Sequence, residues 1–324
     1  MPDRISFSDA INLETLDAEA GIYRANISDA YLIASVPNGG YVASCVSHAA
    51  SLHLAPKSQP HPLTSHFEFI ARSDVGRAII TVDVIKPGRN FTTVHATLYQ
   101  HDLLPASPWI TAGSSRKCIT AYLIMTDLNS QSGLTLPSPW TLPYPPPAKP
   151  DFSLLPADND PLWTTLPLLS GILGKVPCLQ NLKCYAPRGK QEDKTRADLW
   201  IRLATPDAKF TTYTLPFVAD CLPYPVEAFR PRPDETDTDT AYFAADAMFW
   251  YPTLVMNVEV KRPLEEKDGV EWLYLRMQTK EIRNGRLDLE VVVMDEKGEL
   301  IAVAHHVNLV VGLERNTAGR KGKM

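Results

Sequence analysis

The residues with the clearest chemical potential form a short run near the start of the chain, Pro37-Asn38-Gly39-Gly40-Tyr41. Asn38 stands where the N-cap of a helix belongs, so its side chain is expected to accept a hydrogen bond from the first turn. Gly39 and Gly40 allow another group, or a ligand, to come close to the backbone. Because a helix start carries unpaired N–H groups and the positive end of the helix dipole, this run suits a carbonyl oxygen or an oxyanion. The alternative is an ordinary amphipathic helix with an Asn cap.

Other familiar catalytic patterns are missing from the sequence. It contains no Gly-x-Ser-x-Gly motif, which argues against a Ser-His-Asp hydrolase. His48 and His53 are five residues apart, so they do not share a helix face as a zinc-binding His pair would. The five cysteines also lack zinc spacing. We therefore expect neither a metal site nor a cofactor.

The helix that begins at this run should extend over residues 37–55, with apolar residues at Val42, Cys45, Val46 and Ala49 marking one buried face. A loop with two prolines is expected at 58–63. It is followed by runs typical of strands, at 64–71, 79–86, 91–100 and 118–125. One helix followed by an antiparallel meander predicts an α+β unit of about 125 residues.

The second half of the chain repeats this plan after a break. Residues 137–150 contain seven prolines, which predicts a stiff, extended connector outside any core. Beyond it, a helical region interrupted by prolines is expected at 215–229, with strands at 181–185, 197–203, 253–261, 271–280, 286–294 and 300–311. We interpret this as a duplicated fold. The predicted division is an N-terminal unit at 1–130, a proline-rich linker at 131–175, a C-terminal unit at 176–315 and a basic tail at 316–324.

Composition limits the classes of partner. A net charge of −5 argues against nucleic acid, because phosphate binding needs clustered basic surface. No apolar run approaches the roughly 20 residues that cross a bilayer, so a membrane is not expected as a partner. The N-terminus lacks the apolar region of a secretory signal, and the cysteine count is odd, which favours a reduced, cytoplasmic protein.

Several short stretches, taken in order, resemble the acyl-CoA thioesterase II type of the hotdog superfamily and its fungal thioesterase-like relatives. They include Pro37-Asn-Gly-Gly-Tyr, Ser65-His-Phe-Glu-Phe-Ile-Ala-Arg, Val84-Ile-Lys-Pro-Gly-Arg-Asn-Phe, Leu215-Pro-Phe-Val-Ala-Asp-Cys, Trp250-Tyr-Pro-Thr-Leu and Val260-Lys-Arg-Pro. The resemblance implies a tandem double hotdog, that is, two antiparallel sheets each wrapped around a central helix. It also implies hydrolysis of an acyl-CoA thioester.

The resemblance further implies that an Asp, a Ser or Thr, and a Gln from the second unit activate water. The strand pattern Thr/Ser-Leu-Asp falls on Thr253-Leu254-Val255, which puts Val255 at the Asp position. The Ser/Thr position falls on Thr279 and the Gln position on His306. Strand alternation predicts that His305 and His306 point to opposite faces, and that Thr253 points to the same face as Asn257 and Glu259.

Three interpretations follow from the apparent loss of the carboxylate. His306 replaces it as general base, since an unperturbed pKa near ~6.5 suits the task; or another carboxylate serves, either Asp220 or Glu68; or the chain does not hydrolyse its ligand. In the third case it binds an acyl or polyketide group, or assists cyclisation or product release.

The leading expectation is hydrolysis of a CoA-bound or carrier-bound acyl thioester, in a protein that self-associates through its sheets. The expected catalytic residues are Thr279, His306 and Asp220. The expected substrate-binding residues are Asn38, Gly39, Gly40, Tyr41, Glu68, Val255 and Asn257.

Overall fold

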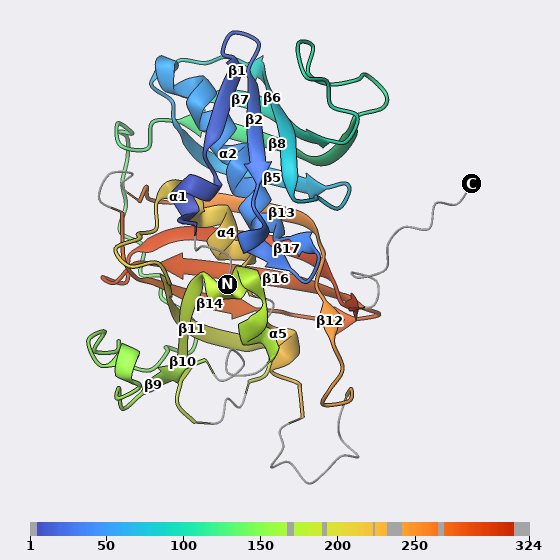
Figure 1. Ribbon diagram of the computed structural model, residues 1–324. Helices are drawn as coiled ribbons and strands as arrows, with labels where there is room; N and C mark the ends of the chain where they lie inside the picture. The colour runs from blue at the N-terminus through green and yellow to red at the C-terminus, as the bar shows by residue number, and fades with distance from the viewer. Residues whose placement is uncertain are drawn as a thin grey trace.

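The computed structural model describes residues 5–166, 172–189, 193–222, 224–231, 242–264 and 269–313. Its main feature is one long antiparallel sheet with helices packed against one side (Figure 1). The predicted basic tail at 316–324 lies outside the described residues. None of the helices in the described ranges has the length and apolar character needed to span a membrane.

The first half of the chain supplies the following strands: β1 Leu13–Asp17, β2 Ile22–Ile27, β3 Leu32–Ile33, β4 Val36–Pro37, β5 His61–Phe69, β6 Gly76–Lys86, β7 Thr92–Gln100 and β8 Arg116–Thr126. The second half supplies β9 Trp163–Thr165, β10 Leu182–Pro187, β11 Arg196–Leu203, β12 Phe249–Trp250, β13 Thr253–Val260, β14 Leu273–Gln278, β15 Ile282–Arg283, β16 Arg286–Met294, β17 Leu300–Leu309 and β18 Val311–Gly312. The helices are α1 Phe7–Ala10, α2 Gly39–Leu54, α3 Pro177–Gln180, α4 Leu215–Asp220 and α5 Tyr224–Glu227. Short 3-10 turns are η1 Asp29–Tyr31, η2 Ala55–Lys57, η3 Leu155–Ala157, η5 Ile172–Lys175 and η6 Thr212–Thr214.

The strand order shows how the two halves are joined. Along the sheet it runs β1-β2-β6-β7-β8-β5-β13-β17-β16-β14-β11-β10-β9. The halves meet where β5 pairs with β13, in an antiparallel register that places Val255 opposite Glu68 and Glu259 opposite Thr64. The sequence predicted two separate sheets. The hydrogen bonds between β5 and β13 instead make one continuous sheet.

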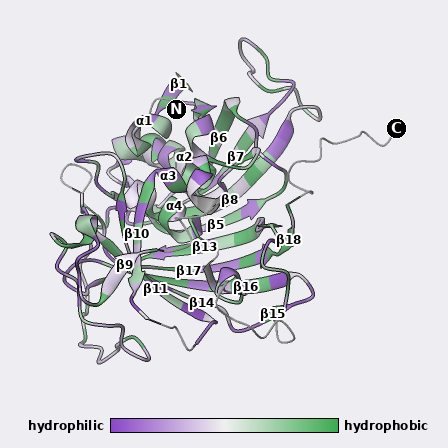
Figure 2. Ribbon diagram, turned by 60° about the horizontal axis from the view of Figure 1, so that its bottom comes forward, coloured by the Kyte–Doolittle hydropathy of each residue, from purple (hydrophilic) through white to green (hydrophobic). Residues whose placement is uncertain are grey.

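Helix α2 is the centre of the hydrophobic core. The prediction of one buried face is too narrow, because residues outside that face are also fully buried, namely Tyr41, Ala43, Ser44, Ser47 and Ala50. The sheet covers one side of α2, and α4 packs against it from the second half. Figure 2 shows α2, α3 and α4 grouped on one side of the central strands. We call the face of the sheet towards these helices the inner face, and the opposite one the outer face.

Two bulges alter the strands expected from the sequence. Strand β5 begins at His61 although Pro62 lies within it, because the pairing with β8 shifts register between Pro62 and Thr64. In β13 the pairing with β17 shifts register between Thr253 and Val255. The extra residue turns Thr253 inward, so it is buried while Asn257 is exposed. The predicted common face for these two residues is therefore wrong.

The proline-rich segment is not a free connector. Residues 127–154 form no helix or strand, yet most of the stretch 135–149 lies along the outer face of the second half of the sheet. Leu142 and Phe152 pack there against a second aromatic core made of Leu155, Trp163, Tyr185, Trp200, Trp272 and Tyr274. Trp163 Nε1 donates a hydrogen bond of 2.8 Å to the carbonyl of Ala148. The range predicted as a linker thus includes β9, which belongs to the sheet.

Candidate active site

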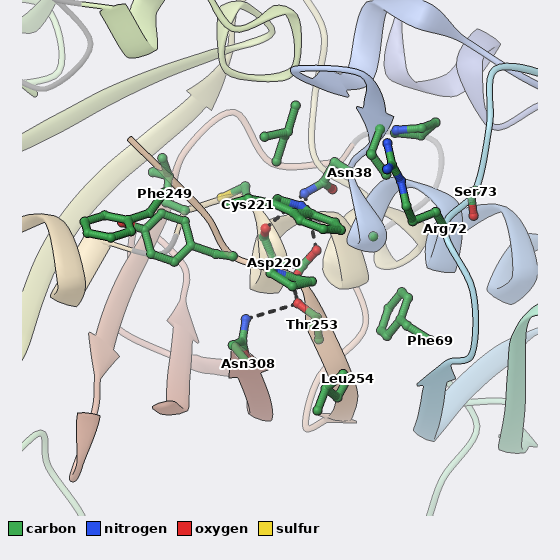
Figure 3. A pocket seen from close by; sticks show the side chains of 18 of the residues that line it. Asn38, Phe69, Arg72, Ser73, Asp220, Cys221, Phe249, Thr253, Leu254 and Asn308 are labelled. Atoms are coloured by element: carbon green, nitrogen blue, oxygen red, sulfur yellow. Dashed lines mark hydrogen bonds between the residues drawn. The ribbon is translucent and has the colours of Figure 1, made fainter. Parts of the chain in front are cut away.

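A cavity of about 340 Å³ opens between the two halves of the chain. Its polar wall is formed by the start of α2, the end of α4, the start of β13 and the end of β17 (Figure 3). Most of the remaining wall is apolar and comes from Ile33, Val36, Phe69, Val176, Leu179, Leu222, Phe249 and Trp250. An apolar cavity with a few convergent polar groups is typical of a small-molecule site.

Asp220, the last residue of α4, is the ionisable group of this polar wall. Its carboxylate accepts hydrogen bonds from the backbone N–H of Gly40 at 2.7 Å, from Thr253 Oγ1 at 2.7 Å and from Asn38 Nδ2 at 3.3 Å. Burial raises the pKa of Asp220 from 3.8 to about 6, although these hydrogen bonds oppose the rise. At neutral pH the group is therefore a carboxylate that takes up a proton more readily than an exposed Asp.

The start of α2 has the cap predicted from the sequence. Asn38 Oδ1 accepts a hydrogen bond from the backbone N–H of Tyr41 at 2.9 Å, and its Nδ2 donates to the carbonyl of Asp220 at 3.1 Å. A Cβ on Gly39 would lie 3.1 Å from Asp220 Oδ2, and one on Gly40 would lie 2.4 Å from the carbonyl of Pro216. The two glycines therefore let α2 and α4 approach closely. The Gly39 N–H has no hydrogen-bond partner within the described residues, and Gly39 lines the cavity.

Thr253 and Asn308 extend the polar wall from the sheet. These two residues are opposite each other in β13 and β17, and Asn308 Nδ2 donates to Thr253 Oγ1 at 3.1 Å. Because the Thr253 hydroxyl accepts this bond, its own proton is directed to Asp220 Oδ1. The result is an oriented chain from Asn308 through Thr253 to Asp220, drawn as dashed lines in Figure 3.

His306 is buried next to Asp220. Its side chain is 0% exposed, and Nδ1 is 3.7 Å from Asp220 Oδ1, which is too long for a hydrogen bond. Neither ring nitrogen has a hydrogen-bond partner within the described residues. Burial lowers the pKa of His306 to about 3, so the imidazole is neutral. His305 points to the other face and is exposed, as strand alternation predicted.

Two protein-family models match the chain. A family model described as the acyl-CoA thioesterase N-terminal domain matches residues 27–126, and one described as the acyl-CoA thioesterase C-terminal domain matches residues 153–310. The chain belongs to the acyl-CoA thioesterase family.

Individual relatives of the family extend the match over nearly the whole chain. The chain is 36% identical to the thioesterase-like protein TwmA of Talaromyces wortmannii, over 98% of this chain and 95% of that protein. A protein with a hotdog fold from Alicyclobacillus acidocaldarius superposes with a TM-score of 0.66 at 16% identity, covering 94% of this chain and 98% of that one. The acyl-CoA thioesterase II TesB2 of Mycobacterium marinum gives a TM-score of 0.60 at 15% identity, covering 95% and 98%. These structures show that the fold is that of the hotdog proteins.

The thioesterase family resemblance implied an Asp, a Ser or Thr, and a Gln. The structure brings together Asp220 and Thr253, with the side-chain amide of Asn308 and the imidazole of His306 beside them. The cavity thus contains a carboxylate although Val255 stands at the position expected for the Asp. This carboxylate belongs to Asp220 at the end of α4, which was one of the alternatives left open by the sequence.

Several residues predicted for the site lie elsewhere. Thr279 Oγ1 is 3.3 Å from Asp288 Oδ1 and faces a different cavity, so the structure does not bring Thr279 together with Asp220. Glu68, Val255 and Asn257 all point to the outer face. In β13 the bulge separates Val255 and Asn257 from Thr253, and Glu68 lies opposite Val255 on β5.

Tyr41 is also outside the cavity. It is fully buried, its ring stacks on Tyr31, and its hydroxyl donates to the carbonyl of Ala10 at 2.8 Å. It therefore anchors α2 in the core and does not face a ligand.

Two residues of the polar wall, Thr253 and Asn308, were missing from the predicted site. Asn308 could have been found, because it is two residues after His306 and so shares its face of β17. Thr253 could not, since nothing in the local sequence reveals the bulge that turns it inward.

A basic side chain stands at the same cavity. Arg72 is the one Lys or Arg among the described lining residues. Its guanidinium lies 5.5 Å from the centre of the Trp250 ring and donates to Ser35 Oγ at 3.1 Å. No group of three or more His, Cys, Asp or Glu side chains in the described ranges is arranged to hold a metal ion.

Proposed function

We propose that this chain hydrolyses an acyl thioester, carried by CoA or by a carrier protein, with Asp220 as the general base. The observation that carries the proposal is a buried carboxylate with a pKa of about 6 that touches the start of α2 inside an apolar cavity. A base whose pKa lies near the working pH combines a high ionised fraction with useful basicity. His306 is a weaker candidate for the base, because burial lowers its pKa to about 3.

In the proposed reaction Asp220 takes a proton from water as the water oxygen bonds to the thioester carbonyl carbon. The negative charge that develops on the carbonyl oxygen is stabilised by the Gly39 N–H at the start of α2. Collapse of this intermediate breaks the C–S bond, and the proton held by Asp220 passes to the departing sulfur. The products are a carboxylic acid and a free thiol, and Asp220 returns to its ionised form.

The neighbours of Asp220 have supporting roles in this proposal. Thr253 directs its proton to Oδ1, and with the Gly40 N–H and Asn38 Nδ2 it supplies three donors to a carboxylate with about four acceptor positions, so capacity remains to accept a proton from water. His306 Nδ1, which has no hydrogen-bond partner within the described residues, offers a further polar atom 3.7 Å from Oδ1. Asn38 holds the end of α4 against the start of α2 through the Asp220 carbonyl. We assign no role to Thr279 or Val255.

The substrate class follows from the lining. The apolar wall suits an acyl chain, and Arg72 suits a phosphate group of CoA or of a phosphopantetheine arm. We further propose that the two halves form a tandem double hotdog. Its N-terminal unit is 1–130, its proline-rich linker 131–175, its C-terminal unit 176–315 and its basic tail 316–324. The free, buried state of all five cysteines supports a reducing compartment, the cytoplasm. Self-association through the sheets remains part of the proposal.

Thiol release from a panel of short to long acyl-CoAs tests this function. We expect turnover by the wild type, a rate that rises with pH up to about 6 and then levels, and loss of most activity in Asp220→Asn. Asp288→Asn is the matched control, because that carboxylate is on the sheet away from the cavity. A wild type that binds acyl-CoA but releases no thiol would favour the alternative function, binding of an acyl or polyketide group or assistance in its cyclisation.

A further inference from the structure

A second carboxylate lies on the wall of the same cavity, and hydrolysis gives it no role. The Glu227 side chain, at the end of α5, is 4% exposed. The Tyr251 hydroxyl donates to Glu227 Oε1, and Arg230 Nε donates to Glu227 Oε2 at 2.6 Å. Tyr251 also lines the cavity. This cluster of Glu227, Tyr251 and Arg230 is called the polar triplet below.

The partners of Glu227 fix the direction of its side chain. Arg230 Nη1 also donates to the carbonyls of Ala245 and Ala247, at 2.8 and 2.7 Å, so the guanidinium is held in one orientation. The ion pair with Glu227 raises the pKa of Arg230, although burial opposes it. Burial, together with the adjacent Glu227, raises the pKa of Tyr251, so its hydroxyl stays protonated and donates.

Hydrogen-bond capacity is left over in this arrangement. An ionised carboxylate offers about four acceptor positions, and the described residues supply Glu227 with two donors. The Tyr251 oxygen also retains acceptor capacity. Around the polar triplet the cavity wall is apolar, with Leu222, Phe249 and Trp250 close by in sequence. Burying a carboxylate in such a wall is costly unless its remaining lone pairs are used.

A saturated acyl chain cannot use those lone pairs. We propose that the substrate's acyl group carries a hydrogen-bond donor, a hydroxyl or an N–H, that binds Glu227 while Tyr251 orients the carboxylate. This inference rests on the proposed function in that it takes the cavity to hold the acyl part of a thioester. Glu227 is then a specificity-determining residue, and Asp220 acts on a thioester whose chain is polar at a point away from the carbonyl.

Binding of thioether analogues tests the inference without requiring turnover. Octyl-CoA thioether, its monohydroxylated isomers and an amide-containing chain of equal length cannot be hydrolysed, and their affinities can be measured by calorimetry. We expect at least one polar analogue to bind the wild type about 10- to 100-fold more tightly than the octyl analogue. In Tyr251→Phe and Glu227→Gln this preference should fall to within about threefold, with the affinity for the octyl analogue little changed.

The controls separate this role from a structural one. Tyr185→Phe alters a buried tyrosine of the second aromatic core and should leave the preference intact. Should Glu227→Gln fail to fold, Tyr251→Phe still decides, because it keeps the ion pair and removes one hydroxyl. The inference is overturned if the wild type binds no polar analogue more tightly than the octyl analogue. It is also overturned if Tyr251→Phe loses affinity equally for both kinds of analogue. Preference without thiol release overturns only the hydrolase proposal, and thiol release without preference overturns only the inference.

Discussion

Replacing Asp220 by Asn should remove activity and stabilise the fold at the same time. Asn has nearly the same shape, and its oxygen can accept the Gly40 N–H while its amide donates to Thr253, whose hydroxyl can rotate. The contacts between α2, α4 and β13 should therefore survive. The lost property is the negative charge, which the proposed reaction needs and the folded state disfavours.

The size of both effects follows from the structure. A positioned general base contributes about 10²- to 10⁴-fold to a rate, so we expect a loss of that order. The pKa of Asp220 is raised from 3.8 to about 6, a difference of about two pH units, and at about 1.4 kcal/mol for each this destabilises the ionised folded state by about 3 kcal/mol. Asp220→Asn should recover up to that amount in the free energy of unfolding at pH 7, a rise in Tm of about 5 °C or more.

The sign of the pH dependence supplies the control. Because the folded pKa is above the unfolded one, the folded state binds the proton more tightly, so this contribution favours folding at low pH and is lost as pH rises from about 4 to 6. The Tm of wild type and Asp220→Asn should therefore converge near pH 4 and differ most at pH 7. Calorimetric melting across this range, with thiol release at pH 7, measures both effects. A variant that is less stable than wild type at pH 7, or that keeps more than about a tenth of the activity, would refute the reasoning.

Four further outcomes are expected. Thr253→Val removes a hydrogen bond that lowers the pKa of Asp220, so the midpoint of the pH–rate profile should move above 6 and kcat should fall about tenfold or more, with Thr253→Ser restoring both. Arg72→Ala should raise KM for acyl-CoA about tenfold. For the N-acetylcysteamine thioester of the same acyl group, which lacks phosphates, KM should stay within about twofold of wild type. Equal effects on both thioesters would contradict a phosphate contact. Gly40→Ala places a Cβ 2.4 Å from the carbonyl of Pro216 and should lower the free energy of unfolding in urea by about 1–3 kcal/mol, whereas an unchanged midpoint would mean that α2 and α4 can move apart. Thr279→Ala, outside the cavity, should keep thiol release within about twofold of wild type, and a larger loss would restore Thr279 to the site.

Much of the fold could be predicted because its elements carry strong local patterns. The Asn38 cap and the apolar spacing of the first helix indicated the start of α2, and alternation marked β6 and β7 to within a few residues. Local pattern could not show that β5 and β13 pair, since sheet pairing depends on contacts between distant segments. The packing of the proline-rich segment on Trp163 and Trp200 was missed for the same reason.

The site was predicted less completely, and the reason is physical. Asp220 was recognised as a candidate carboxylate. Its raised pKa, however, depends on burial, which the close approach of α4 to Gly40 creates. The alternation rule succeeded for His305 and His306 in regular β17. It failed for Thr253, because the extra residue in β13 places the side chains before the bulge on the opposite face from the one that alternation predicts.

If the two halves form the proposed double hotdog, the difference between α2 and α4 has an evolutionary consequence. In an assembly of two identical chains, both helix starts would have to carry the same residues, and any change in one would appear in the other. Here α2 has sixteen residues and begins with a capped glycine pair, whereas α4 has six and begins at Leu215-Pro216 after η6. Covalent linkage of the halves frees each from its copy's constraints. Mutation can therefore reshape the walls contributed by the second half, and so change the ligand, while the glycine pair of the first half is left untouched.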